Sequence, residues 1–159
     1  MNLNATTAMF RAKLGGAAVT PVFICSWEDI NLMNQEVSYG SRDVIATGTA
    51  EVELTGSDTA TNAWRVPERT RRKITHLSCY NADASAQTVT IEHYDGTNAR
   101  QICVVTLQAG EWLHYTPESG WIVRTTAGAA KTVGAVTGQA SLARGTMWYG
   151  DANGAAAVL

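Results

Sequence analysis

The sequence is short of charge. Lys and Arg number 12 and Asp and Glu number 14 among 159 residues, so charged side chains make up 16%, whereas a soluble domain usually has about 25%. The formal net charge is −2, so no overall positive field attracts nucleic acid or anionic lipid, and we expect neither as a partner. A surface with so few charges suits a subunit whose faces are covered by neighbouring proteins.

Cysteine is scarce, and its spacing excludes the common motifs. Cys25, Cys79 and Cys103 are odd in number and form no CxxC pair. This spacing argues against a disulfide framework and favours buried thiols in a reducing compartment. Cys79 and Cys103 lie among apolar neighbours in expected strands, which favours core packing over a catalytic thiol.

The groupings of histidine and carboxylate that mark common enzyme sites are also missing. His76, His93 and His114 fall on different expected strands without HxH or HxxxH spacing. A three-histidine metal site would need those strands to bring the rings together, and we expect isolated sheet histidines instead. Glu51 and Glu53 are two residues apart, so we expect them on the solvated face of one strand rather than across a glycosidase cleft.

Longer motifs are absent too. The sequence has no glycine-rich phosphate loop and no Gly-x-Ser-x-Gly elbow. No window approaches about 20 consecutive apolar residues, and the first residues lack the basic start and apolar run of a signal peptide. We therefore expect a protein that is not an enzyme, with no catalytic residue, no metal, no cofactor and no membrane segment.

What the sequence does contain is a series of short strand patterns, clearest between about residues 43 and 126. Apolar and polar residues alternate, and turn residues such as Asp95-Gly96 separate the segments. The expected strands are Val19–Trp27, Ile45–Leu54, Lys73–Asn81, Thr88–Tyr94, Arg100–Leu107, Glu111–Thr116 and Trp121–Thr125. This spacing leaves no room for crossover helices. It predicts a mainly β fold, an antiparallel β-sandwich or jelly-roll-like domain with extended N- and C-terminal arms.

Composition divides the chain into three parts. Residues 1–40 predict an N-terminal arm or an extra strand, residues 41–127 the antiparallel β-sandwich domain, and residues 128–159 a Gly/Ala-rich C-terminal arm. The last part has too little charge for a typical disordered tail and too few large side chains for its own core. Either it becomes ordered on another subunit, with Trp148 and Tyr149 as the anchor, or it is a flexible tail.

One segment, Arg65–Lys73 (RVPERTRRK), is strongly basic. Two interpretations are open. Guanidinium groups can contact a neighbouring protein, in which case Arg69, Arg71 and Arg72 are the expected residues. Alternatively, the segment is a solvated loop that Glu68 partly neutralises.

Aromatic residues gather toward the end of the strand series. Trp112, Tyr115 and Trp121 are the main members of this group. On one interpretation they close the core or contact another subunit, and on the other they form a platform for a glycan.

Several segments carry a resemblance to a known family. They are Ile74–Asp83 (ITHLSCYNAD), the strand pair around Asp95-Gly96-Thr97 ending in VTLQAGE, Gly120–Val123 closing with Gly128, and Gly145–Gly150 (GTMWYG). Together these segments resemble small structural virion proteins of tailed bacteriophages, the last resembling fibre-type proteins. The resemblance covers about a third of the chain, and the first 70 residues match no family.

The resemblance implies a β-sandwich homo-oligomer at the capsid, neck or tail that needs no catalytic residue. It also implies a virion protein made in the host bacterial cytoplasm, with capsid, portal or tail subunits as partners. We therefore predict a non-enzymatic structural protein of a phage virion, of the capsid-decoration, neck or tail type, that self-associates and binds neighbouring subunits. The alternative is a receptor- or glycan-binding tail fibre module.

Overall fold

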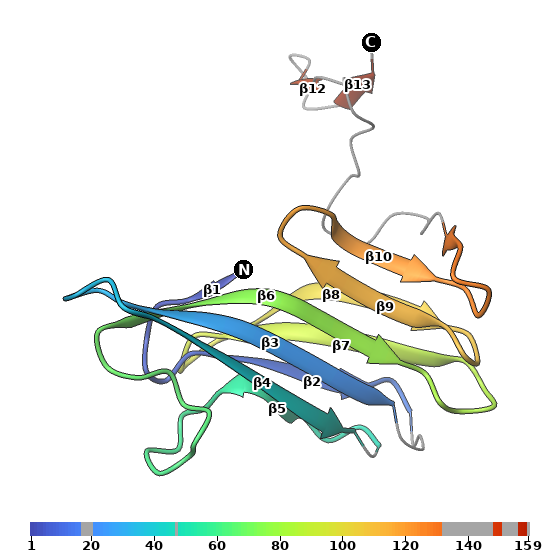
Figure 1. The fold of residues 1–159 in the computed structure, drawn as a ribbon. Helices are drawn as coiled ribbons and strands as arrows, with labels where there is room; N and C mark the ends of the chain where they lie inside the picture. Colours follow the sequence, from blue (N-terminus) through green and yellow to red (C-terminus); the bar gives the residue numbers. More distant parts are fainter. Residues whose placement is uncertain (17–20, 47, 132–147, 151–155, 159) are drawn as a thin grey trace.

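The computed structural model describes residues 1–16, 21–46, 48–131, 148–150 and 156–158 (Figure 1). Within these ranges every regular element is a β-strand. The described residues contain no helix long and apolar enough to cross a membrane. The strands are β1 (Asn2–Leu3), β2 (Met9–Leu14), β3 (Val22–Asn31), β4 (Val37–Ile45), β5 (Val52–Gly56), β6 (Thr70–Tyr80), β7 (Gln87–Tyr94), β8 (Ala99–Leu107), β9 (Trp112–Thr116), β10 (Gly120–Arg124), β11 (Ala130–Lys131), β12 (Trp148–Gly150) and β13 (Ala156–Val158).

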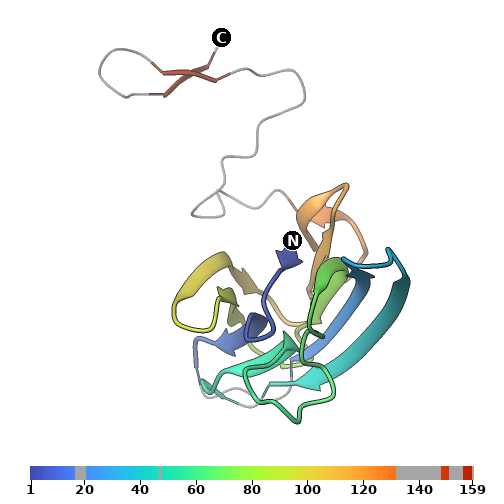
Figure 2. The ribbon, with the colours of Figure 1, turned by 90° about the vertical axis from the view of Figure 1, so that its left-hand side faces the viewer.

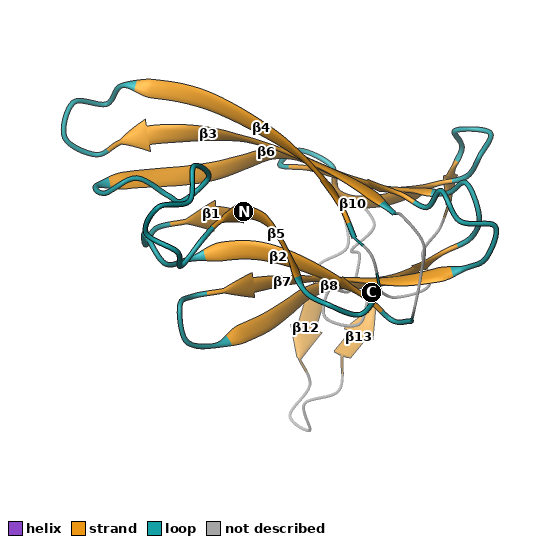
Figure 3. Ribbon diagram, turned by 90° about the horizontal axis from the view of Figure 1, so that it is seen from below, coloured by secondary structure: helices purple, strands orange, loops and turns teal. Residues whose placement is uncertain are grey.

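Eleven of these strands form two antiparallel sheets. The seven-stranded sheet has the order β11-β10-β9-β6-β3-β4, with β1 added alongside β6, and the four-stranded sheet has the order β5-β2-β7-β8. The two sheets lie face to face (Figure 3). The antiparallel β-sandwich predicted from the strand spacing is therefore confirmed.

The core lies between the sheets, where alternate residues of each strand meet. Phe23 and Cys25 of β3 and Leu77 of β6 point inward from the seven-stranded sheet, and Val89 and Ile91 of β7 point inward from the four-stranded sheet. All five are buried. This alternation is the period of two that a half-buried strand requires.

The described residues among the first 40 contribute strands to both sheets, so this part of the chain is neither an arm nor a single extra strand. β2 lies between β5 and β7 in the small sheet, and β3 lies between β4 and β6 in the large one. The sequence did not predict β2 as a strand, because Arg11 and Lys13 place two charges within it. They project outward and pair with Glu92 of β7 at 3.2 and 2.7 Å, while Ala12 between them is buried. These two ion pairs satisfy the charge of Glu92, which is 2% exposed.

The single strand expected over Ile45–Leu54 is wrong, because the chain turns within it. β4 ends at Ile45 and β5 begins at Val52 in the opposite sheet. Gly48 lies in this connection with φ of 83°, a left-handed conformation that glycine adopts without strain. The strands expected from residue 73 onward all exist, with ends that differ by a few residues, and β6 begins earlier, at Thr70.

A β-bulge in β6 changes which of its residues face the core. Ser26 of β3 pairs with His76 and Trp27 pairs with Ile74, so Thr75 is an extra residue on β6. Beyond such a bulge the inward and outward positions exchange. Odd-numbered Leu77 points inward on one side of the bulge, and even-numbered Ile74 and Arg72 point inward on the other.

Candidate assembly surface

Exposed apolar side chains are concentrated in one place on the described part of the molecule. The large apolar side chains that are exposed there all belong to β4 or to the hairpin loop before it: Leu32, Met33, Val37, Tyr39 and Ile45. Tyr39 is 79% exposed and Met33 is 71% exposed. Because β4 is also the last strand of its sheet, we call this set the β4 edge. An open strand edge that carries apolar side chains is a template for pairing with another chain.

The hairpin loop presents Leu32 and Met33 from a hydrogen-bonded turn. Oδ1 of Asn31 accepts a hydrogen bond from the backbone nitrogen of Met33 at 2.8 Å. The backbone nitrogen of Gln35 donates to the carbonyl oxygen of Asn31 at 2.9 Å, and Gln35 has φ of 60°. The tip of this hairpin lies at one end of the molecule (Figure 1), so the loop holds both apolar side chains outward.

Packing on the inner face of β4 fixes the strand against the sandwich. Gly40 lies so close to the indole of Trp27 that an added Cβ would overlap the ring. The guanidinium of Arg42 lies 3.5 Å from the centre of a Trp64 ring and donates to the carbonyl oxygen of Glu53 at 2.7 Å. The strand is therefore anchored on one face, and within the described structure its second edge pairs with no strand.

The basic segment, in contrast, does not form one contact surface. Arg69 and Arg71 are exposed, whereas Arg72 is 3% exposed. The expectation that Arg72 contacts a partner is therefore wrong, because the bulge at Thr75 turns its side chain into the sandwich. For Arg69 and Arg71 a partner contact stays a prediction.

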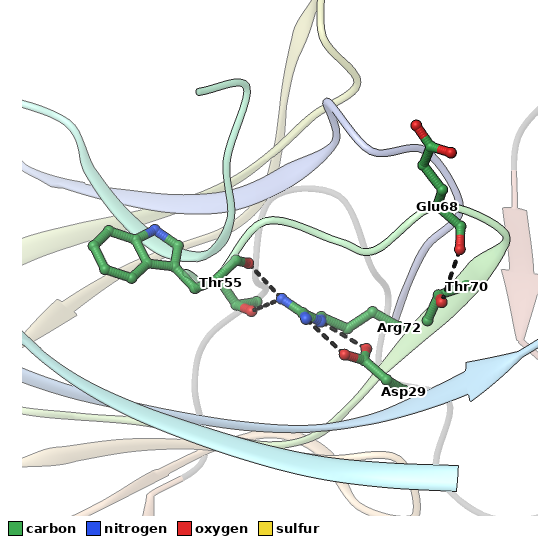
Figure 4. A network of polar contacts seen from close by, with 6 residues as sticks. Asp29, Thr55, Glu68, Thr70 and Arg72 are labelled. Atoms are coloured by element: carbon green, nitrogen blue, oxygen red, sulfur yellow. Dashed lines mark hydrogen bonds and ion pairs between the residues drawn. The ribbon is translucent and has the colours of Figure 1, made fainter. Parts of the chain in front are cut away.

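Arg72 instead holds a buried polar network between the two sheets (Figure 4). Its Nε and Nη2 donate to the two carboxylate oxygens of Asp29 at 2.7 and 2.6 Å. Its Nη1 donates to Oγ1 of Thr55 at 3.0 Å and to the carbonyl oxygen of Trp64 at 2.6 Å. The guanidinium also lies 4.5 Å from the centre of a Trp27 ring. A bidentate pair of this kind satisfies a buried charge, so the network is structural.

A cleft of about 710 Å³ is a second candidate site, and residues of both sheets line it. Figure 2 shows the N-terminal strand between the β7–β8 and β9–β10 hairpins, and residues of that strand and of both hairpins line the cleft. Tyr115 and Trp121 lie in it with ring centres 5.0 Å apart, next to Phe10 and Gln101. Its volume is in the range of small-molecule sites.

The three aromatic residues predicted as a glycan platform are not brought together. Tyr115 and Trp121 face the cleft, but Trp112 projects from the opposite face of β9, because it is three residues from Tyr115 on the same strand. There Trp112 packs against Tyr80, with ring centres 4.3 Å apart. Only two of the three residues could therefore bind one ligand in the cleft.

Histidine and carboxylate side chains form no metal site among the described residues. His76 and His114 are neighbours with ring centres 5.9 Å apart, while His93 packs against Phe10. Burial, with the charges of His76 and Arg124, lowers the pKa of His114. The pKa of His114 therefore lies below its usual value of about 6.5.

The remaining candidate nucleophiles and acids are three cysteines, which are buried, and two glutamates, which pair with other side chains. Cys25, Cys79 and Cys103 are all buried, as the sequence predicted, and burial raises the pKa of Cys25 and of Cys103 to about 12. A thiol with such a pKa is not a nucleophile at neutral pH. Glu53 is half-buried rather than fully solvated, and its carboxylate accepts a hydrogen bond from Nε1 of Trp64 at 2.8 Å. Glu51 pairs with Arg11 at 2.6 Å.

The anchor predicted in the C-terminal arm falls largely outside the described residues. Trp148 and Tyr149 belong to β12, whose backbone pairs with β13, but their side chains are not among the described ones. Residues 132–147, 151–155 and 159 also lie outside the described ranges.

Comparison of the chain with protein-family models, with curated proteins and with solved structures gives no match. What the protein does must therefore be inferred from its own residues.

Proposed function

We propose that this protein is a non-enzymatic structural subunit that self-associates and contacts neighbouring proteins in a bacteriophage virion. The observation that carries the proposal is the β4 edge, a terminal strand that concentrates the exposed apolar side chains of the described structure. Burying such side chains against another subunit contributes roughly 25 cal/mol for each Å² of apolar surface removed from water. A low content of charged residues fits the same role.

The phage assignment rests on sequence resemblance. The segments that resemble small virion proteins lie mainly in β6 to β10, the part of the chain that builds much of both sheets. Such a subunit would be made in the host bacterial cytoplasm and would bind capsid, portal or tail subunits. Arg69 and Arg71 are exposed on this chain and are the charged residues proposed to contact a neighbour.

The mass of the full chain in solution tests the self-association. We expect sedimentation analysis from micromolar to millimolar concentration to show a stable oligomer or a monomer that associates as concentration rises. Replacing Tyr39 with Asp should shift the distribution toward monomer, because a charge would have to be desolvated at the contact. A wild-type chain that is monomeric at every concentration would refute the proposal.

A second candidate function is recognition of a glycan by a tail fibre module. The observation that favours it is the pairing of Tyr115 with Trp121 in one cleft, because aromatic faces combined with amide groups such as that of Gln101 are suited to sugar rings. Glycan-array binding that is lost on Trp121→Ala, with an unchanged circular dichroism spectrum, would support this function. Binding that is equally lost on Trp112→Ala would contradict it, because Trp112 faces away from the cleft.

A further inference from the structure

Among the described residues, the backbone of β4 has a defined set of hydrogen-bonding groups that pair with no other strand. At the two ends of the β3–β4 ladder, Asn31 donates to the carbonyl oxygen of Glu36 and Ala46 donates to that of Pro21. The register between these ends is unbroken. Because hydrogen-bonded and non-hydrogen-bonded pairs alternate in an antiparallel ladder, every even-numbered residue of β4 bonds to β3. The odd-numbered residues therefore direct their N–H and C=O groups outward.

The side chains of these odd-numbered residues also share one face. They form an exposed row on the outer face of the sheet: Val37, Tyr39, Ser41, Asp43 and Ile45. This row is nearly symmetrical about Ser41. An apolar residue stands at each end. On either side of the centre stands a side chain with a polar group, Tyr39 on one side and Asp43 on the other.

We propose that two copies of the chain pair through their β4 edges, antiparallel and centred on Ser41, so that the two seven-stranded sheets become continuous. This inference deepens the proposed self-association by naming the partner, a second copy, and the register. In this arrangement Ser41 lies opposite Ser41 of the second copy and Tyr39 lies opposite Asp43. Val37 lies opposite Ile45, which buries the two apolar ends against each other. Every outward N–H and C=O group of the row then meets a complementary group.

Other registers that match the free backbone groups are less favourable. Centring on Arg42 or on Asp43 places like charges opposite each other, which destabilises a cross-strand pair. Centring on Gly40 sets Val37 opposite Asp43, and centring on Tyr39 sets Val37 opposite Ser41. Both of these leave Ile45 without an apolar partner within the strand. Only the register centred on Ser41 joins both apolar ends and keeps like charges apart.

Engineered cysteines test this register directly. Opposite residues of a hydrogen-bonded antiparallel pair have Cα atoms about 5.5 Å apart, within the range of about 4.4 to 6.8 Å that a disulfide spans. With oxidised glutathione, full-length Ser41→Cys should form a covalent dimer on a non-reducing gel. The native thiols should not interfere, because Cys25, Cys79 and Cys103 are buried.

Matched variants on the same strand serve as controls. Tyr39→Cys and Asp43→Cys should each cross-link poorly alone, but a mixture of the two should give the mixed dimer. If Tyr39→Cys or Asp43→Cys alone cross-links as well as Ser41→Cys, the proposed register is wrong.

A binding measurement separates this inference from the broader proposal. We expect Val37→Lys to raise the dimer dissociation constant at least about tenfold, while Thr106→Lys, exposed on β8 at the edge of the other sheet, leaves it unchanged. A wild-type chain that oligomerises without Ser41→Cys cross-linking and without an effect of Val37→Lys would refute the β4 pairing alone. A chain that never oligomerises would refute both the pairing and the proposed self-association.

Discussion

Replacing Arg72 with Met is expected to destabilise the fold strongly, although the sequence favours an exposed residue at this position. The change removes the cation that satisfies both carboxylate oxygens of Asp29, a residue only 8% exposed. Breaking a buried ion pair by removing one partner costs about 3 to 5 kcal/mol. The carbonyl oxygen of Trp64 keeps a second donor, the backbone nitrogen of Gly56 at 3.0 Å. Losing the hydrogen bond from Arg72 therefore does not leave this oxygen unsatisfied. We therefore expect the free energy of unfolding to fall by about 3 to 5 kcal/mol.

Urea unfolding of the wild type, Arg72→Met and Arg71→Met measures this loss. Arg71 is the adjacent exposed residue, so its replacement should change the free energy of unfolding by no more than about 0.5 kcal/mol. Adding Asp29→Leu to Arg72→Met should recover most of the loss, because it removes the unpaired carboxylate and leaves apolar groups on both strands. A loss below about 1 kcal/mol for Arg72→Met, or a double variant less stable than the single one, would refute the buried network as described.

Two further predictions follow from the packing of β4 and β2. Gly40→Ala should lower the free energy of unfolding by about 1 to 3 kcal/mol, because the added methyl group overlaps the Trp27 indole. Gly16→Ala, at a position with open space around it, is the control, and equal effects in thermal unfolding would contradict the overlap. Burial alone would raise the pKa of Glu92, but the hydrogen bonds and charges of Lys13 and Arg11 outweigh it and lower that pKa. Its contribution to stability is therefore complete above the unfolded-state pKa of about 4.3 and is lost as pH falls through the lower folded-state value. The deficit of Glu92→Gln relative to wild type in urea unfolding should shrink from pH 7 to pH 3, and a constant deficit would contradict the ion pairs.

Period-two patterning was sufficient to predict the sandwich and the strands of its second half. Those strands alternate clearly, and turn residues such as Asp95-Gly96 separate them. The sequence did not predict β2 or β4 as strands, because their polar positions carry charge or glycine. Arg11 and Lys13 neutralise Glu92 across the sheet, and Gly40 makes room for Trp27. These roles depend on side chains of the neighbouring strand, so they cannot be predicted from the sequence of one strand alone.

The position of Arg72 could not be predicted for a related reason. Counting in steps of two from Leu77 and Cys79, both inward, places Arg71 inward and Arg72 outward. The extra residue at Thr75 reverses this order, and it is visible only in the pairing of β6 with β3. The outer row from Val37 to Ile45 was not predicted either, because the polar residues Ser41 and Asp43 interrupt its apolar pattern. Its exposure also depends on β4 being the last strand of the sheet.

The order of strands also determines how many neighbours such a subunit could engage. β4 and β11 lie at opposite edges of the same sheet, and the chain continues past Lys131 from the edge farthest from β4. Two copies joined at β4 would therefore carry their β11 strands at the two distant ends of a single continuous sheet. Each pair would then be a bivalent unit with identical, oppositely directed ends, a geometry from which either closed rings or extended arrays can be built.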